Sequence, residues 1–265
     1  MIFIPIGLAG IAVILFFVGR SQNKKAYDMK SVQTSTAAAL AQSAADVSKE
    51  IGAGSFSQQA EVKGTAECAN PLKSEMNGSD CVWYRSTVTR EYEESYTERD
   101  SEGRTKTGTR RGSETVSSNE RSVPFLLRDE SGTITVDPTG ASIEGERLVS
   151  QFEQGDRGPS LSFGNFRVNL GALGSGRRTI GYKLEEWAIT LGKRLYVLGE
   201  ARDDENRLRI GKPSKKGERF IISVKSEEEL TKSAESGAKI LAIIGIVLGV
   251  CAIVSAVLLV LTGKI

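Results

Sequence analysis

The stretch ILAIIGIVLGVCAIVSAVLLVLTG, residues 240–263, is almost purely aliphatic and lies between Lys239 and Lys264. An α-helix rises about 1.5 Å per residue and the hydrocarbon core of a bilayer is about 30 Å thick, so about 20 apolar residues complete one crossing. A second uncharged stretch, MIFIPIGLAGIAVILFFVG, occupies residues 1–19. The sequence therefore predicts two transmembrane helices, with the hydrophilic part of the chain between them.

The first stretch lacks the features of a cleavable signal peptide. The first basic residue of the chain, Arg20, follows the apolar run instead of preceding it. The run ends in Leu15, Phe16, Phe17, Val18 and Gly19, which is not a small-residue cleavage pattern. We therefore expect this stretch to remain as an uncleaved span.

Basic residues near the spans favour a cytoplasmic location for the middle of the chain. Lysine and arginine follow the first span and precede the second, whereas only Lys264 and the terminal amine lie on the far side. The positive-inside rule then puts both termini outside. Because long loops translocate largely regardless of their charge, the opposite orientation stays open.

The composition excludes several classes of function. Lysine and arginine number 35 against 33 aspartates and glutamates, and this balance gives no electrostatic case for nucleic acid. The chain contains no histidine and three cysteines, of which Cys251 lies in the second span. Ser-His-Asp and Cys-His catalysis are therefore excluded, and Cys68 with Cys81 cannot alone build a four-ligand zinc site. We expect no catalytic residues, cofactor or metal.

The region between the spans divides into a stalk and a β-domain. Residues 20–54 are polar and rich in alanine, and helical spacing predicts a short helix over residues 35–51 that lies on the domain or on a second copy. Residues 55–226 show short alternating strands, for example over 82–92, 123–128 and 180–189. The predicted fold is a membrane-anchored, mainly β protein with an antiparallel barrel or sandwich-like domain. Residues 100–112 are interpreted as a solvated hairpin tip, and the glycine-rich residues 171–176 as a flexible loop.

A capping box predicts how the domain connects to the second span. Ser226 is followed by Glu227, Glu228 and Glu229, which is typical of a helix start. The predicted connecting helix, residues 227–239, runs directly into the span over 240–263. Small residues on that span are candidates for helix packing against the first span or another copy: Gly245, Gly249, Ala252 and Ala256.

Several short motifs in this order resemble one family. They are PLKS (71–74), CVWYR (81–85), VPFLL (123–127) with Asp129 and Gly132, and then Glu186, Ile189, Gly192, Leu195, Tyr196, Val197, Gly199 and Glu200. Over residues 55–265 the chain resembles the GIDE family, which contains organelle-membrane RING ubiquitin ligases and many bacterial and archaeal relatives. The resemblance implies a "beside a membrane" domain between two spans. In the ligases that domain lies on the side opposite the cytosol.

The resemblance does not extend to the ligase module. In the ligases a RING with eight zinc ligands follows the second span, whereas here only Lys264 and Ile265 follow Gly263. We therefore expect a RING-less, prokaryotic member that has no zinc site of its own.

The functional prediction is a non-catalytic binding or scaffold module beside the bilayer. Candidate partner-binding residues are Trp83, Arg85, Glu186 and Glu200, although a strand tryptophan is usually core and a strand-end glutamate is usually solvated. The expected partners are the lipid bilayer, an unidentified protein and a second copy of the chain. Two alternatives stay open: a ubiquitin-ligase-like subunit that takes a RING from another chain, and an architectural oligomer that shapes membranes.

Overall fold

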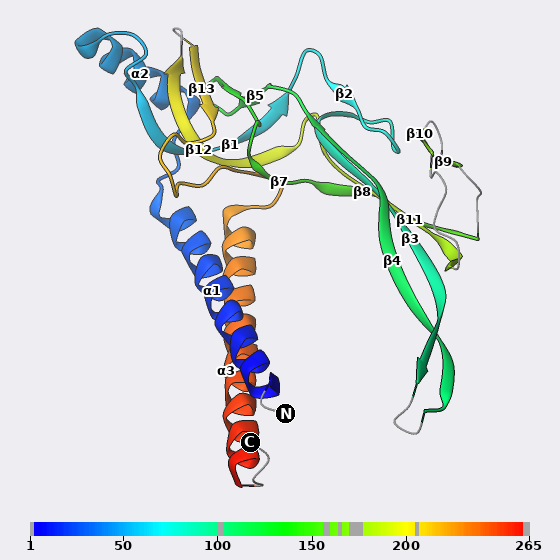
Figure 1. Cartoon of the computed structure of the whole chain (residues 1–265). Coiled ribbons are helices and arrows are strands. Elements are labelled where there is room, and N and C mark those ends of the chain that lie inside the picture. The colour runs from blue at the N-terminus through cyan, green and yellow to red at the C-terminus, as the bar shows by residue number, and fades with distance from the viewer. Residues whose placement is uncertain are drawn as a thin grey trace.

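Figure 1 shows the computed structural model of the chain, in which β-sheets sit at one end of a pair of long helices. The structure describes residues 3–99, 103–155, 160–163, 166–169, 177–204 and 207–261. The glycine-rich loop predicted over 171–176 lies outside these ranges. The described helices are α1 (Phe3–Ser31), α2 (Ala37–Ile51) and α3 (Glu227–Leu261). The described strands are β1 (Ser57–Glu67), β2 (Leu72–Lys73), β3 (Asp80–Arg99), β4 (Thr105–Ser122), β5 (Phe125–Arg128), β6 (Thr133–Val136), β7 (Ser142–Glu144), β8 (Glu146–Gln154), β9 (Ser160–Phe163), β10 (Phe166–Asn169), β11 (Arg177–Thr190), β12 (Arg194–Asp204), β13 (Arg207–Gly211) and β14 (Ile221–Ser223).

Five strands close into a small barrel in the order β1, β5, β6, β13 and β12, because β12 pairs back onto β1. The closing pair runs from Ser57 opposite Arg202 to Thr65 opposite Arg194. Alternation along these strands turns one set of side chains inward. Core side chains that are at most 2% exposed include Val62, Leu127, Ile134, Val197 and Ile210. The mainly β fold and the barrel among the predicted alternatives are thus confirmed.

The predicted antiparallel pairing holds for most strand pairs but not for two of them. β13 pairs with β6 in parallel, with Ile210 opposite Val136, and β14 pairs with β7 in parallel, with Ile222 opposite Ile143. Only a direct hairpin forces antiparallel pairing. Between β6 and β13, and between β7 and β14, the chain passes through the second sheet. The later strand of each pair can therefore run in either direction relative to the earlier one.

The second sheet extends away from the barrel. Its order is β4, β3, β11 and β8, with the short β2 also paired to β3. Beyond Glu94, the last residue of β3 that pairs with β11, β3 and β4 continue as a two-stranded ribbon. We call residues 89–99 of β3 and 105–115 of β4 the arm, and β11 still pairs with its base over residues 89–94. In Figure 1 the arm descends on the same side of the barrel as α1 and α3, and its tip is level with the lower turns of α3.

The predicted solvated tip over residues 100–112 is wrong from residue 105 onward, because β4 begins at Thr105, and its residues 100–102 lie outside the described ranges. Two cross-strand pairs explain this extension: Tyr92 lies opposite Gly112, and Tyr96 lies opposite Gly108. A Cβ built on Gly112 would meet the Tyr92 ring at 2.7 Å, and one on Gly108 would meet the Tyr96 ring at 2.8 Å. Each tyrosine therefore packs flat over the glycine backbone and stabilises a ribbon whose other residues are mostly polar.

The helices connect to the barrel as the sequence predicts. α2 matches the helix expected over residues 35–51: Thr36 caps its first turn by accepting from the Ala39 N–H at 3.2 Å, and Leu40 and Ala44 are buried. α3 starts with the predicted capping box, in which the Ser226 N–H donates to Glu229 and the Glu229 N–H donates to Ser226. α3 then continues without interruption to Leu261, so the connecting helix and the apolar segment are one helix.

One helix of the described chain, over Glu227–Leu259, is long and apolar enough to cross a membrane. Residues 1–2 and the side chains of residues 3–5 and Leu8 lie outside the description, so only part of the first apolar stretch is described. The expectation of two spans is therefore supported for the C-terminal segment alone.

Candidate functional site

Trp83 and Arg85 lie on β3 and share one acid of β4. Trp83 is 2% exposed and its indole N–H donates to Glu120 Oε1 at 2.8 Å. The Arg85 guanidinium pairs with Glu120 Oε2 at 2.9 Å and lies over the Trp83 ring, 5.5 Å from its centroid. The Arg85 side chain keeps 43% exposure. Trp83 is thus a core residue, and the accessible part of this pair is the guanidinium with its carboxylate.

Glu186 is buried and holds a loop. Its carboxylate accepts the backbone N–H of Met76 at 2.7 Å and that of Asn77 at 3.0 Å. These N–H groups belong to the turn between β2 and β3. Burial, followed by the charge of Glu186, raises the pKa of the nearby Cys81 thiol to about 11. Glu186 therefore fixes the turn instead of facing a ligand. Cys81 and Cys68 are both free thiols.

Glu200 likewise holds a loop in place, in this case on the barrel. It is 6% exposed and accepts from the Ser57 hydroxyl, from the Ser214 N–H at 2.6 Å and from the Ser214 hydroxyl at 3.0 Å. Burial alone would raise its pKa, but the hydrogen bonds from the two serines outweigh burial and hold that pKa below the ordinary value. Glu200 thus ties the start of β1 to the loop after β13.

The four candidate residues do not meet in one site. Trp83, Arg85 and Glu186 share the β3–β11 ladder, in which Arg85 pairs with Trp187 and Ser86 pairs with Glu186. Glu200 lies on β12 in the barrel. Of the four, only Arg85 has a largely accessible side chain, so the sheet face around Arg85 and Glu120 remains the candidate partner surface.

The arm next to this face carries a network of ion pairs. Arg90 is 2% exposed and pairs with Glu114 at 2.9 Å. On the surface, Glu93 pairs with Arg111 at 3.1 Å and with Arg178 at 3.0 Å. These arginines hold the pKa of Glu93 below its ordinary value. The network joins β3, β4 and β11 and stiffens the base of the arm.

A polar junction that sequence reasoning missed joins the barrel to the helices. Glu61 on β1 is fully buried and accepts from the Thr34 hydroxyl. Lys63 lies 3.1 Å from Glu61 and 2.8 Å from Glu227 in the first turn of α3. Burial alone would lower the pKa of Lys63, but hydrogen bonds to Glu227 and Glu61 raise it. Burial and the Glu61 charge also raise the pKa of Tyr196. The sequence alone gives no signal, because Glu61 alternates with the inward-facing Ala60 and Val62 and is buried by the segment that covers the outside of β1.

Further contacts fix the two long helices to each other and to the barrel. Arg219 pairs with Asp28 of α1 at 3.0 Å, and Lys30 of α1 pairs with Glu235 of α3 at 2.6 Å. An apolar cluster completes the junction with residues from α1, β12, β14 and α3: Ala26, Met29, Tyr196, Leu198, Ile221, Leu230 and Ala234. The barrel and the helix pair are therefore connected through a packed interface and not through a flexible linker.

The candidate helix-packing residues of α3 follow one stripe of the helix but differ in how they are covered. A Cβ on Gly245 would lie 3.6 Å from the Ala12 carbonyl oxygen of α1, and Ala252 is 6% exposed. At Gly249 a Cβ would meet no described atom within 4 Å, and Ala256 is exposed among the described residues. Gly245 thus lies against α1, whereas the α1 side chains nearest to the level of Gly249 lie outside the described set.

Comparison with known proteins identifies the class of this chain. The architecture is a small barrel and a sheet fixed to an apolar helix, and a family model described as "GIDE: E3 Ubiquitin ligase" matches residues 93–259. Because this match covers more than half of the chain, the protein belongs to the GIDE family. No curated protein and no solved structure matches it.

Proposed function

We propose that this GIDE-family protein is a non-catalytic scaffold that is anchored in a membrane by two spans and presents a β-sheet surface to a protein partner. The observation that carries the proposal is the continuity of α3. The same helix packs on the barrel through Leu230 and Ala234 and then provides the apolar segment that is long enough for a bilayer. A domain held in this way keeps a fixed orientation relative to the membrane.

The pairing of the helices supports a second span in α1. A Cβ on Gly19 would lie 3.6 Å from the Ala238 carbonyl oxygen, so Arg20 and Lys239 are at the same level of the helix pair. Below this level both helices are apolar, and above it both carry charges. A bilayer surface that meets one helix at this level meets the other there too.

The partner surface in this proposal is the sheet face of Arg85 and Glu120. Site-directed photocrosslinking from position 87, the next residue on the same face of β3, tests it in native membranes, with Arg85→Gln as the variant. Arg128→Gln is the matched control, because Arg128 forms a similar exposed pair with Glu67 on the barrel. A specific adduct that is lost in the Arg85 variant and retained in the control supports the surface. Equal capture by both variants contradicts it.

The family description favours one alternative, a ligase-like subunit that borrows a RING from another chain. A reconstituted ubiquitin-transfer assay with candidate RING partners distinguishes it from the scaffold. If this chain does not stimulate transfer, the alternative is rejected.

A third proposal is an architectural oligomer formed by the spans. The small residue Gly249 supports it, because no described atom lies within 4 Å of a Cβ built there and a second copy could approach. Gly249→Ile should abolish crosslinked dimers in membranes while leaving the α1 contact at Gly245 intact. Unchanged dimers contradict this proposal.

A further inference from the structure

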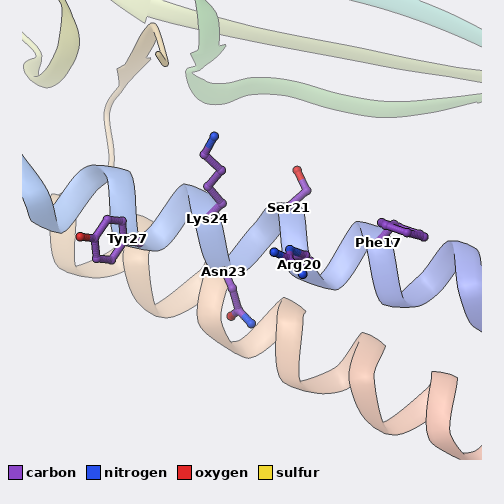
Figure 2. A pocket seen from close by; sticks show the side chains of 6 residues that line it. All are labelled: Phe17, Arg20, Ser21, Asn23, Lys24 and Tyr27. Carbon is purple, nitrogen blue, oxygen red and sulfur yellow. The ribbon is translucent and has the colours of Figure 1, made fainter. Parts of the chain in front are cut away.

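α1 has a hollow at the level where its sequence changes from apolar to charged. Its volume is about 590 Å³ and it is lined by Phe17, Arg20, Ser21, Asn23, Lys24 and Tyr27. Figure 2 shows Ser21 and Lys24 projecting from the side of α1 opposite α3, while Asn23 projects toward α3. Arg20 and Lys24 are four residues apart and thus lie on one helix face, with Phe17 one turn below Arg20.

Arg20 and Lys24 carry charges that the described part of the chain does not neutralise. Neither forms an ion pair with a described residue, whereas Lys30 and Arg219, which lie nearby in the junction, are paired with Glu235 and Asp28. Arg20 and Lys24 are therefore free to bind an external anion.

The loop between β13 and β14 adds positive charge beside the hollow. A Cβ on Gly217 would lie 3.9 Å from Lys24 Nζ, so this loop reaches the lysine ammonium. The loop carries Lys212, Lys215 and Lys216. Lys215 is paired with Glu218 at 3.4 Å, and Lys216 is exposed. The surroundings of the hollow thus favour a negatively charged occupant.

The lower edge of the hollow is apolar. Phe17 is 63% exposed, and its neighbour Phe16 is 61% exposed, on a helix whose preceding residues are aliphatic. Tyr27, at the upper edge, is 71% exposed and combines an aromatic ring with a hydroxyl. Cations above an apolar surface, with aromatic rings at the boundary, match a molecule that has an anionic head and hydrocarbon chains.

We propose that Arg20 and Lys24 bind the headgroup phosphate of an anionic phospholipid, whose acyl chains lie along Phe17 and the apolar turns below it. The site takes a phospholipid and not a soluble phosphate compound, because the hollow is continuous with the apolar surface of α1. This inference rests on the proposed membrane anchoring.

The test uses the full chain reconstituted in phosphatidylcholine vesicles that contain a trace of spin-labelled phosphatidylglycerol or spin-labelled phosphatidylcholine. Electron paramagnetic resonance measures the fraction of each lipid held at the protein. We expect a preference for phosphatidylglycerol in the wild type. A basic residue at an anionic lipid surface contributes about fivefold in binding. Arg20→Gln with Lys24→Gln should therefore lower the preference by up to about 25-fold, to about that of phosphatidylcholine.

The matched control is Lys49→Gln with Lys73→Gln, which removes the same net charge from exposed sites on α2 and β2. The control should keep the wild-type preference. A wild-type protein without any preference, or an equal loss in both double variants, overturns the lipid site. Carbonate extraction of the same vesicles separates the two levels of inference: release of the chain overturns the anchoring, whereas a retained chain without lipid preference overturns only the site.

Discussion

Lys63 on β1 lies 2.8 Å from Glu227 in the first turn of α3, so an ion pair connects the barrel wall to the start of the apolar helix. The two residues are far apart in the sequence, and they meet only when the barrel is closed and α3 is docked. Because Lys63 also pairs with the buried Glu61, the docking of α3 and the neutralisation of a core carboxylate depend on the same ammonium group.

Lys63→Met should destabilise the protein by about 2 kcal/mol, because it leaves the Glu61 carboxylate buried without a counter-charge. The value is lower than the ~3–5 kcal/mol typical of a fully buried pair, since the Lys63 side chain keeps some contact with water. Urea unfolding of the full chain in detergent, followed by tryptophan fluorescence, measures the loss.

The control for this prediction is the double variant Glu61→Gln with Lys63→Met, which removes the buried charge together with its partner. It should be more stable than Lys63→Met alone. A double variant that is as unstable as the sum of the two single variants would show that the pair is not coupled.

Glu200→Gln should lower stability by about 1–2 kcal/mol at pH 7, because it weakens the hydrogen bonds from Ser57 and Ser214. The pKa of Glu200 is lowered by folding, so its contribution is present above the unfolded-state value of 4.5 and is lost as the pH falls through the folded value. The stability difference between the two proteins should therefore shrink below pH 4.5. A difference that is constant from pH 7 to pH 3 contradicts this account.

Gly112→Val should loosen the arm, because its side chain would occupy the space of the Tyr92 ring. Overpacking of this kind costs about 1–3 kcal/mol. Hydrogen exchange should become faster in residues 89–99 and 105–115 and stay unchanged in the barrel. Thr109→Val, at an exposed neighbouring position, should leave the exchange of the arm as it is in the wild type.

Glu186→Ala should cost about 2–4 kcal/mol, since the N–H groups of Met76 and Asn77 would lose their acceptor. Glu186→Gln keeps one acceptor oxygen and should cost roughly half as much. Thermal unfolding of the full chain ranks the variants. If Glu186→Ala is as stable as the wild type, the turn between β2 and β3 is held by other contacts.

The parts of the fold that sequence predicted are those set by local pattern. The capping box at Ser226, the helix over residues 35–51 and the strand within residues 123–128 follow from capping, spacing and alternation that lie within one segment. The parallel β13–β6 and β14–β7 pairs are long-range choices made when the barrel closes. The second half of the arm is a strand because of tyrosines on the partner strand, so its own polar sequence does not predict it.

The candidate site shows the same division. Trp83, Glu186 and Glu200 are aromatic or acidic residues in motifs that resemble the GIDE family. Their partners are backbone and side-chain groups from other segments of the chain. Glu61 and Lys63 look like ordinary residues of an alternating strand. Their importance arises from Thr34 and Glu227, which only the folded chain brings to them.

The direction of the arm has a consequence for anchoring. The tip of the arm is level with the apolar turns of α3 (Figure 1). The arm bears Arg99 and Lys106 near its tip, and Arg110 and Arg111 nearer its base. Hydrocarbon does not accept such a ribbon, because each charge at the centre of a bilayer costs several kcal/mol. If a flat bilayer surrounds α3, the arm must therefore rotate away from the hydrocarbon, about the sheet from which it extends. The orientation of the arm would then be coupled to the insertion of α3 into the bilayer.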